Sequence, residues 1–225
     1  MQLWIGNKNY SSWSLRPWLL MTHTGIAFEE VKLRLGFAPD SEFKRRLAAV
    51  SPAGRVPVLV DGDLSVWDTL AIAEYLAETH PDKQLWPAEV KARARARSMC
   101  AEMHSGFAAL RSNCPMNIEA SLPEVGARLL RDVAALQADL ARINGMWGQQ
   151  LAASGGPFLF GAFTATDAYF APVCARIRTY ALPVAPDVAG YVGRMFALPA
   201  MQRWVADALA EHDWLDEDEP YRRRE

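Results

Sequence analysis

Short apolar blocks separated by polar turns make up the first eighty residues. Residues 3–6 form a brief apolar run, which predicts a short strand. In residues 14–24 apolar side chains recur every three or four positions up to Gly25, which predicts a helix closed by glycine. Residues 28–35 end in strict alternation of apolar and polar side chains, the pattern of a half-buried strand. The chain is therefore expected to open with a βαβ unit.

The next block adds a short helix, a hairpin and a second long helix. The helix is expected over 43–49. Apolar runs at 56–60 and 64–66 flank Asp-Gly-Asp at 61–63, and Asp-Gly between apolar runs is a strong hairpin signal. Residues 68–79 again show helical spacing. The order predicts a small mixed sheet with helices on its faces.

After residue 80 the pattern is almost entirely helical. Residues 80–87 contain two prolines and no periodicity, as expected of an interdomain linker. A capping-box sequence at 121–124 is expected to start one helix that continues to residue 151 and ends at Gly-Gly-Pro, residues 155–157. Later helices are expected over 165–180, 188–196 and 201–210, and a charged, frayed tail over 216–225.

These patterns predict an α/β domain followed by an all-α domain. The N-terminal domain is expected to span residues 1–79 and the linker residues 80–88. The helical bundle is expected to span residues 89–225.

Composition excludes several protein classes. The 225 residues are 51% hydrophobic and 22% charged, which is typical of globular chains. A net charge of −2 argues against a nucleic-acid partner. No apolar run reaches the ~18–20 residues of a membrane span, and the N-terminus lacks a secretory pattern. We therefore expect a soluble cytoplasmic protein without a membrane partner.

The cysteines and histidines indicate neither disulfides nor a metal. Cys100, Cys114 and Cys174 are widely spaced and odd in number, so they do not form a disulfide framework or a zinc motif. None of the four histidines is paired at helical spacing. The cysteines are expected to be buried as small apolar residues.

Hydroxyl side chains gather where the first strand ends and the first helix begins. Ser11, Ser12 and Ser14 lie in Tyr-Ser-Ser-Trp-Ser-Leu-Arg-Pro, residues 10–17. A helix N-terminus favours anions, so these residues could form an anion site. Ser14 could equally act only as the helix cap, with Pro17 in the first turn.

Two further segments carry polar groups at element ends. A cis Val56–Pro57 bond would leave the Val56 N–H and C=O free to pair with an extended peptide, whereas an ordinary trans proline is the commoner alternative. Asp68 and Thr69 place a carboxylate and a hydroxyl at another helix start, where capping is the alternative interpretation.

In combination, these motifs resemble the glutathione S-transferase family, serine-type, with a zeta-like N-terminal motif. The resemblance rests on Ser-Ser-x-Ser-x-Arg, then Gly-x-Val-Pro-x-Leu, then Asp-Thr-x-Ala-Ile-x-x-Tyr-Leu. Residues 161–168 look like the helix-capping motif of the family's C-terminal domain. The resemblance implies a thioredoxin-like domain that binds glutathione, a helical domain that supplies the second-substrate pocket, and a homodimer.

The resemblance also implies roles for individual residues. Ser11 falls at the position of the catalytic serine, with Ser12 as the alternative. Val56 would pair its backbone with the cysteinyl part of glutathione, and Arg55 would reach the glycine carboxylate. The γ-glutamyl amine and carboxylate would be held by the two residues that replace the family's usual Glu-Ser, Asp68 and Thr69.

The second-substrate pocket is expected beside a helix over 99–111. His104 and Arg111 are seven residues apart and therefore share a face of that helix. Arg111 could bind an anionic substrate or form an interdomain salt bridge, and His104 could be a core histidine. Arg176 and Arg178 are further candidates.

A serine can activate the thiol without a metal or a flavin. A free thiol has a pKa of ~8.5, so little of it is thiolate at neutral pH. Lowering that pKa by ~2 units requires ~2.7 kcal/mol. One charge-assisted hydrogen bond of ~1.5–3 kcal/mol together with a helix dipole of ~0.3–1 kcal/mol supplies this amount. Because hydroxyls stand at both ends of Ser-x-x-Ser, glutathione has to bring the sulfur.

Three functions follow from the resemblance. The first is transfer of glutathione to a small, largely apolar electrophile. The second is maleylacetoacetate-type isomerisation, although the zeta-type enzymes carry cysteine after the paired serines where this chain has Trp13, which would make the pocket entrance more apolar. The third is a non-catalytic binding or regulatory protein on the same fold.

Overall fold

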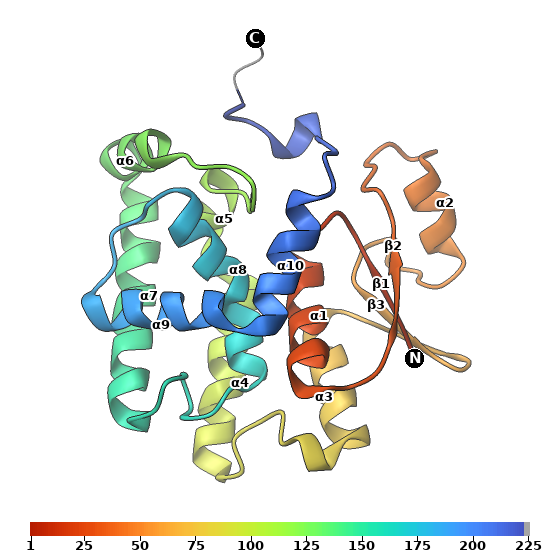
Figure 1. Ribbon diagram of the computed structural model, residues 1–225, viewed down its shortest axis with the longest axis horizontal. Coiled ribbons are helices and arrows are strands. Elements are labelled where there is room, and N and C mark those ends of the chain that lie inside the picture. Colours follow the sequence, from red (N-terminus) through yellow and green to blue (C-terminus); the bar gives the residue numbers. More distant parts are fainter. Residues whose placement is uncertain (223–225) are drawn as a thin grey trace.

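Four short strands form a mixed sheet in the order β2-β1-β3-β4 (Figure 1). The structure is a computed structural model that describes residues 1–222. β1 (Gln2–Ile5) runs parallel to β2 (Glu29–Lys32) and antiparallel to β3 (Val58–Asp61), which pairs antiparallel with β4 (Leu64–Trp67). Asp61 faces Leu64, so two residues close the hairpin. The predicted mixed sheet and hairpin are confirmed.

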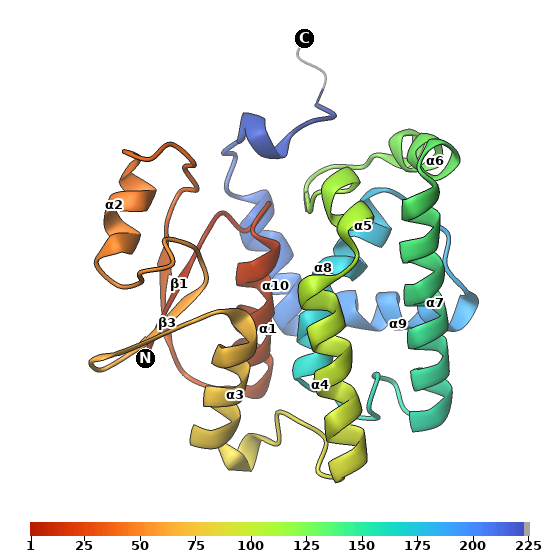
Figure 2. The same ribbon diagram turned by 180° about the vertical axis from the view of Figure 1, so that it is seen from behind.

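Helices cover both faces of this sheet. α1 (Ser12–Thr24) and α3 (Thr69–Thr79) pack together on one face, and α2 (Glu42–Ala48) lies on the other (Figure 2). Side chains alternate along β1: Leu3 contributes to the large core that contains α1, whereas Trp4 packs against the smaller cluster that contains α2. The N-terminal part is thus the expected α/β layer structure.

The rest of the chain is helical. A 3₁₀ turn (Pro81–Lys83) lies in the expected linker. Seven α-helices and a second 3₁₀ turn follow in the described part of the chain: α4 (Val90–Ser105), α5 (Ala108–Asn113), α6 (Pro123–Asp132), α7 (Ala134–Ser154), α8 (Ala165–Thr179), α9 (Pro186–Ala197), α10 (Pro199–Leu209) and η2 (Asp216–Asp218). The predicted α/β plus all-α fold class is confirmed.

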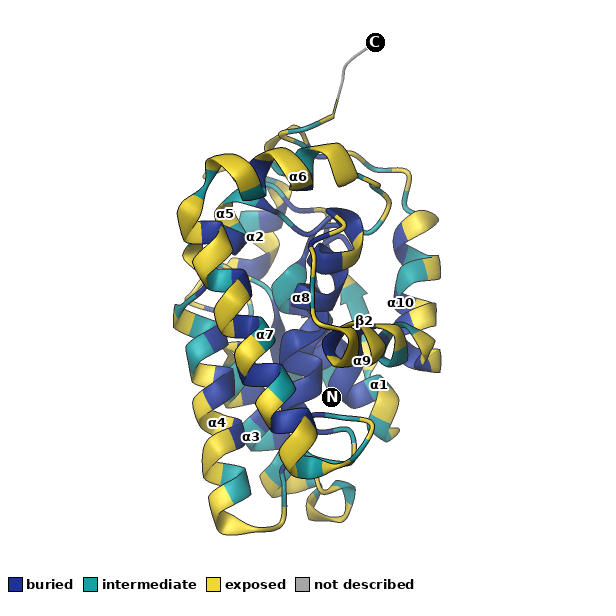
Figure 3. Cartoon of the chain, turned by 90° about the vertical axis from the view of Figure 1, so that its left-hand side faces the viewer, coloured by how far each residue is buried: buried dark blue, intermediate teal, exposed yellow. Residues whose placement is uncertain are grey.

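Helix α8 is the centre of the molecule. It is buried along almost its whole length (Figure 3) and packs against α1, α4 and α9. At its start Thr164 and Asp167 form a capping box, which confirms the motif expected at 161–168. The fully buried Asp167 carboxylate also accepts hydrogen bonds from the Leu159 N–H and the Tyr191 hydroxyl. This carboxylate joins α8, α9 and the preceding loop.

The single long helix expected from 121 to 151 is wrong. The 121–124 sequence does not form a capping box, because Leu122 is the N-cap residue of α6 and makes no side-chain bond. The chain leaves helical geometry at Val133 and restarts as α7. α6 lies directly on the backbone of Tyr180, where a Cβ at Gly126 would be 1.9 Å from the carbonyl oxygen. This close contact sets a direction for α6 that α7 does not share (Figure 1).

The helix expected over 99–111 is also two helices. α4 ends at Ser105, and Phe107 has a φ of +54°, which interrupts the helix before α5 begins. Helical periodicity continues across this break, so apolar spacing alone does not reveal it.

Two further expectations at the chain's ends need correction. α1 begins at Ser12 with Ser11 as the N-cap residue, so Ser14 lies in the first turn and does not cap the helix. The tail does not fray at 216–222, because Leu215 is buried and Tyr221 donates a hydrogen bond to the Asn113 carbonyl. Residues 223–225 of the expected frayed tail lie outside the described residues.

The capping carboxylate of α8 yields a stability prediction. Asp167→Ala leaves buried donors of Leu159, Thr164 and Tyr191 unpaired, so we expect the free energy of unfolding to fall by more than about 3 kcal/mol. Urea denaturation measures this loss. The exposed Glu78→Ala is the control and should change stability by less than about 0.5 kcal/mol. Equal effects of the two substitutions would contradict the prediction.

Candidate active site

A cavity of about 740 Å³ opens between the N-terminal domain and the helical domain. It is bounded by the β1–α1 loop, the segment before β3, α2, α5 and the C-terminal segment. Of the predicted site residues and further candidates, seven line it: Ser11, Ser12, Trp13, Arg55, Val56, Arg111 and Arg176. The chain thus brings together residues separated by a hundred positions in the sequence.

The serines lie at the N-terminus of α1. Ser11 Oγ donates a hydrogen bond to Ser14 Oγ at 2.7 Å, and Ser14 Oγ accepts the N–H of Gly6 at 3.1 Å. Both serines are buried, whereas Ser12 is half-buried. Ser11 makes no side-chain capping bond, and it lines the cavity at the N-terminus of α1, the positive end of the helix dipole.

A second wall presents backbone groups. The Val56–Pro57 bond is cis, as one of the two interpretations of the sequence had it. No hydrogen bond within the described residues uses the Val56 N–H or C=O. Arg55 is exposed beside them, and Lys44 of α2 also lines the cavity while donating to the Gly54 carbonyl. Nothing in the sequence pattern pointed to Lys44.

Asp68 and Thr69 are not among the described residues that line the cavity. Asp68 is the N-cap residue of α3, with a φ of +74°, and accepts the Leu70 N–H. Its Oδ2 lies 3.5 Å from Nε2 of His104. Thr69 is buried, and its hydroxyl is 2.6 Å from the hydroxyl of Tyr169. Both residues therefore have structural partners, and their glutathione-binding roles stay predictions.

Trp13 is surrounded by cationic and imidazole groups. Its ring centre lies 5.1 Å from that of His104, and the guanidinium of Arg111 lies 5.0 Å from it. Arg111 also donates to the His104 carbonyl, so the two residues meet although they belong to different helices. The predicted shared face is wrong, since the break at Phe107 brings them together instead.

Two buried arginines lie behind this wall. Arg16 is sandwiched between Trp13 and Tyr169, and its Nε and Nη1 have no hydrogen-bond partner in the described structure. Arg176 lines the cavity and donates to the carbonyls of Cys114 and Pro172. Burial lowers the pKa of each guanidinium to about 10, so both stay charged at neutral pH.

Sequence reasoning identified these arginines only in part. Arg16 is the last residue of the Ser-Ser-x-Ser-x-Arg motif, but the motif predicted no role for it. Its spacing of three from Trp13 nevertheless places the two side chains on one face of α1. Arg178, weighed equally with Arg176, lies over the ring of Phe196 and lines a different hollow. Only Arg176 reaches the cavity.

The protein's own thiols are unsuited to chemistry at this site. All three cysteines are buried. Burial raises the pKa of Cys100 and Cys114 to about 12 and that of Cys174 well above its usual range. Within the described residues, no group of three or more His, Cys, Asp or Glu side chains could hold a metal ion. A reactive sulfur at Ser11 must therefore come from a ligand.

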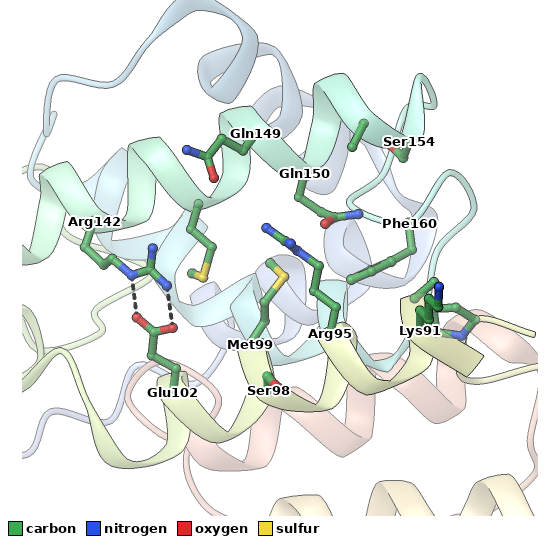
Figure 4. A pocket seen from close by; sticks show the side chains of 14 residues that line it. Lys91, Arg95, Ser98, Met99, Glu102, Arg142, Gln149, Gln150, Ser154 and Phe160 are labelled. Atoms are coloured by element: carbon green, nitrogen blue, oxygen red, sulfur yellow. Dashed lines mark hydrogen bonds and ion pairs between the residues drawn. The ribbon is translucent and has the colours of Figure 1, made fainter. Parts of the chain in front are cut away.

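A larger hollow of about 820 Å³ lies elsewhere, between α4 and α7. Figure 4 shows Arg95 and Gln150 directed into it and the ion pair between Glu102 and Arg142 at one end. It contains neither the serines nor the free backbone of Val56. We place the chemistry in the smaller cavity for that reason.

The structure joins a thioredoxin-like α/β domain to a helical domain, with serines at their junction. This architecture is that of a class of glutathione-binding proteins, and comparison with family models assigns the chain to the same class. Family models described as "Glutathione S-transferase, N-terminal domain" and "Glutathione S-transferase, C-terminal domain" match residues 10–79 and 92–207. The chain belongs to the glutathione S-transferase family.

Individual relatives fall into several classes. A probable maleylacetoacetate isomerase of Caenorhabditis elegans is 34% identical over 100 residues, 44% of each chain. The matches to the first curated relatives thus span about two fifths of their length. Glutathione S-transferase F14 of Arabidopsis thaliana is 31% identical over 85% of this chain and 77% of its own.

Solved structures share the fold. A bacterial zeta-class maleyl pyruvate isomerase superposes with a TM-score of 0.70 at 21% identity, over 96% of this chain and all of the other. A Burkholderia glutathione transferase homologue with bound glutathione gives 0.69 at 23% identity, over 94% and 98%. Likeness at this identity establishes the architecture.

The buried hydroxyl pair of Thr69 and Tyr169 can be tested by a double-mutant cycle. Thr69→Val leaves the Tyr169 hydroxyl without this partner, so the free energy of unfolding should fall by about 1–3 kcal/mol. Adding Tyr169→Phe should recover most of that loss, because both polar groups are then replaced by apolar ones. Strictly additive losses in urea denaturation would contradict a direct bond.

Proposed function

We propose that the protein is a glutathione transferase that holds the thiol of glutathione as a thiolate for attack on a small electrophile. The observation that carries this proposal is the position of Ser11, which lines the cavity at the N-terminus of α1 and makes no side-chain capping bond there. The unpaired Val56 backbone in the same cavity supports it, because such groups pair with an extended peptide.

Three polar groups in series prepare Ser11 as a donor. The Gly6 N–H donates to Ser14 Oγ, which lies 2.7 Å from Ser11 Oγ. When a thiolate binds, the direction of the bond between the two serines would reverse: the Ser14 hydroxyl would donate a hydrogen bond to Ser11 Oγ, and the Ser11 hydroxyl would donate one to the sulfur. Each bond in such a series polarises the next, which strengthens the last donor.

The remaining groups suit the rest of the tripeptide. Val56 would pair with the cysteinyl backbone, and Arg55 and Lys44 would hold the glycine carboxylate. Asp68 and Thr69 remain our candidates for the γ-glutamyl end, and Ser12 the alternative donor to sulfur.

The cavity favours an electrophile with an apolar part and a carboxylate. Trp13, Phe37 and Met116 supply apolar walls, while Arg111 and Arg176 supply positive charge. A conjugated dicarboxylic acid fits this combination, so glutathione-dependent isomerisation of a maleylacetoacetate-type substrate is the second candidate function. The names of the zeta-class relatives support it. A non-catalytic binding role is the outcome if no electrophile reacts.

We also propose a cytoplasmic homodimer with a role in detoxification. Exposed large apolar residues that a partner subunit would cover include Leu64, Trp67 and Val90. Among the described residues, no helix is both long and apolar enough to cross a membrane.

Substitution of the serines tests the thiolate proposal. Ser11→Ala removes the donor to sulfur, so the pKa of bound glutathione should rise and kcat should fall by about 10- to 150-fold, the equivalent of ~1.5–3 kcal/mol. Ultraviolet titration of the bound thiolate and a chlorodinitrobenzene assay measure the two effects. Ser12→Ala is the matched control and should change kcat by less than about threefold. The reverse pattern would assign catalysis to Ser12.

Substitution of Arg111 tests the proposed anionic electrophile. Arg111→Gln should lower kcat/KM about tenfold or more for an electrophile that carries a carboxylate, because a charge-assisted hydrogen bond is lost. Its neutral methyl ester should be affected less than about twofold. Equal losses for acid and ester would show that Arg111 does not recognise the carboxylate.

A further inference from the structure

The last described segment of the chain, residues 211–222, returns to the N-terminal domain. It lies beyond the residues matched by the family's C-terminal domain, which end at 207. Leu215 is buried in the small cluster formed by Tyr10, strand residues and α2. The last described segment therefore completes the small cluster on the α2 face of the sheet.

Acidic side chains of this segment contact each of the four residues that precede Ser11. Asp213 accepts from the Asn7 amide, and Glu211 accepts from the backbone N–H groups of residues 8 and 9. Glu219 accepts from the Tyr10 hydroxyl at 2.6 Å. The loop 7–10 is thus held from outside at every position.

The loop also has internal hydrogen bonds and contacts with other elements, such as the bond from the Trp204 indole N–H to the Lys8 carbonyl. Asn7 C=O accepts the N–H groups of Tyr10 and Ser11, so the path of the loop into α1 depends on where residue 7 lies. Asn9 Oδ1 accepts two N–H groups from the segment between α5 and α6, at Ile118 and Glu119. No strand partner follows Ile5 to fix the loop by a ladder.

The segment also reaches the cavity itself. Asp218 lines it, together with Tyr10, Arg111 and Arg176. It is the one acidic residue among those that line the cavity in the described structure. Residues 211–222 are therefore part of the site and not an appendage of the bundle.

We propose that residues 211–222 form a positioning element for the catalytic serine, and that Glu219, acting through the Tyr10 hydroxyl, sets where the Ser11 hydroxyl lies. This inference rests on the proposed role of Ser11. Glu219 does not touch the reacting atoms: it is a positioning residue.

Geometry makes Glu219 the most direct contact of the segment. Tyr10 is adjacent to Ser11, and its ring is buried, so a shift of the ring moves the Ser11 backbone. The Glu219 side chain is only 9% exposed, and within the described residues its carboxylate also accepts a hydrogen bond from the Arg222 guanidinium at 3.4 Å. A charge-assisted O–H···O bond between two such buried groups is short and strong. The donor to a thiolate needs placement to within about 0.5 Å, so loss of this bond reaches the chemistry.

The test measures the pKa of glutathione bound to four variants. Glu219→Ala and Tyr10→Phe both remove the bond, and Tyr10→Phe keeps the ring. Each should raise the pKa of bound glutathione by at least about 0.5 unit. At a pH below that pKa, this rise lowers the fraction of thiolate about threefold. Glu219→Gln keeps an acceptor for Tyr10 and should retain the lowered pKa. Glu217→Ala removes an exposed carboxylate from the same segment and should have no effect.

Urea denaturation of the same variants separates positioning from simple stability. Lower stability in Glu219→Ala and Tyr10→Phe with an unchanged thiol pKa would overturn the proposal. A wild-type pKa equal to that of free glutathione would instead overturn the proposed function. A lowered wild-type pKa that responds to Ser11→Ala but not to Glu219→Ala or Tyr10→Phe would overturn the positioning role alone.

Discussion

Enclosure of α1 is the constraint on which the rest of the structure depends. Residues 14–21 are all buried, because the sheet covers one side of the helix while α3, α8 and α10 cover the others. A helix buried all round cannot rotate or slide without opening a core. Its N-terminus therefore presents Ser11 and Ser12 at a fixed place between the two domains, where the polar cavity opens.

Most of the charged groups around that N-terminus act in one direction. The helix dipole, the exposed Arg55 and the cationic side chains of Arg111 and Arg176 each favour an anion in the cavity. Arg16 remains charged without carboxylate pairing because two aromatic faces, those of Trp13 and Tyr169, receive it. Positive charge of this kind would help to stabilise a bound thiolate, whereas Asp218, the one acidic residue among those that line the cavity in the described structure, acts in the opposite direction.

Local patterns predicted the elements well, and long-range contacts less so. Alternation and helical spacing located the strands and most helices, because each pattern reflects burial of one face. Apolar spacing did not predict the breaks at Val133 and Phe107, because it continues across both of them and does not signal the positive φ of Phe107. The tail had the charge of a solvated segment, and only the fold shows that Glu219 meets a residue 209 positions earlier.

The tryptophan at position 13, where the zeta-type motif has cysteine, does more than make the pocket entrance apolar. Its ring contacts His104, Arg16 and Arg111, and His104 in turn lies 3.5 Å from the Asp68 carboxylate. A cysteine at this position would leave both arginines without an aromatic face here, although Arg111 would keep its own hydrogen bond to the His104 carbonyl. Through His104, Trp13 thus links the start of α3, where the γ-glutamyl group is proposed to bind, to the cationic end of the cavity. The sequence departure therefore changes a contact between two parts of the site and not only the polarity of its entrance.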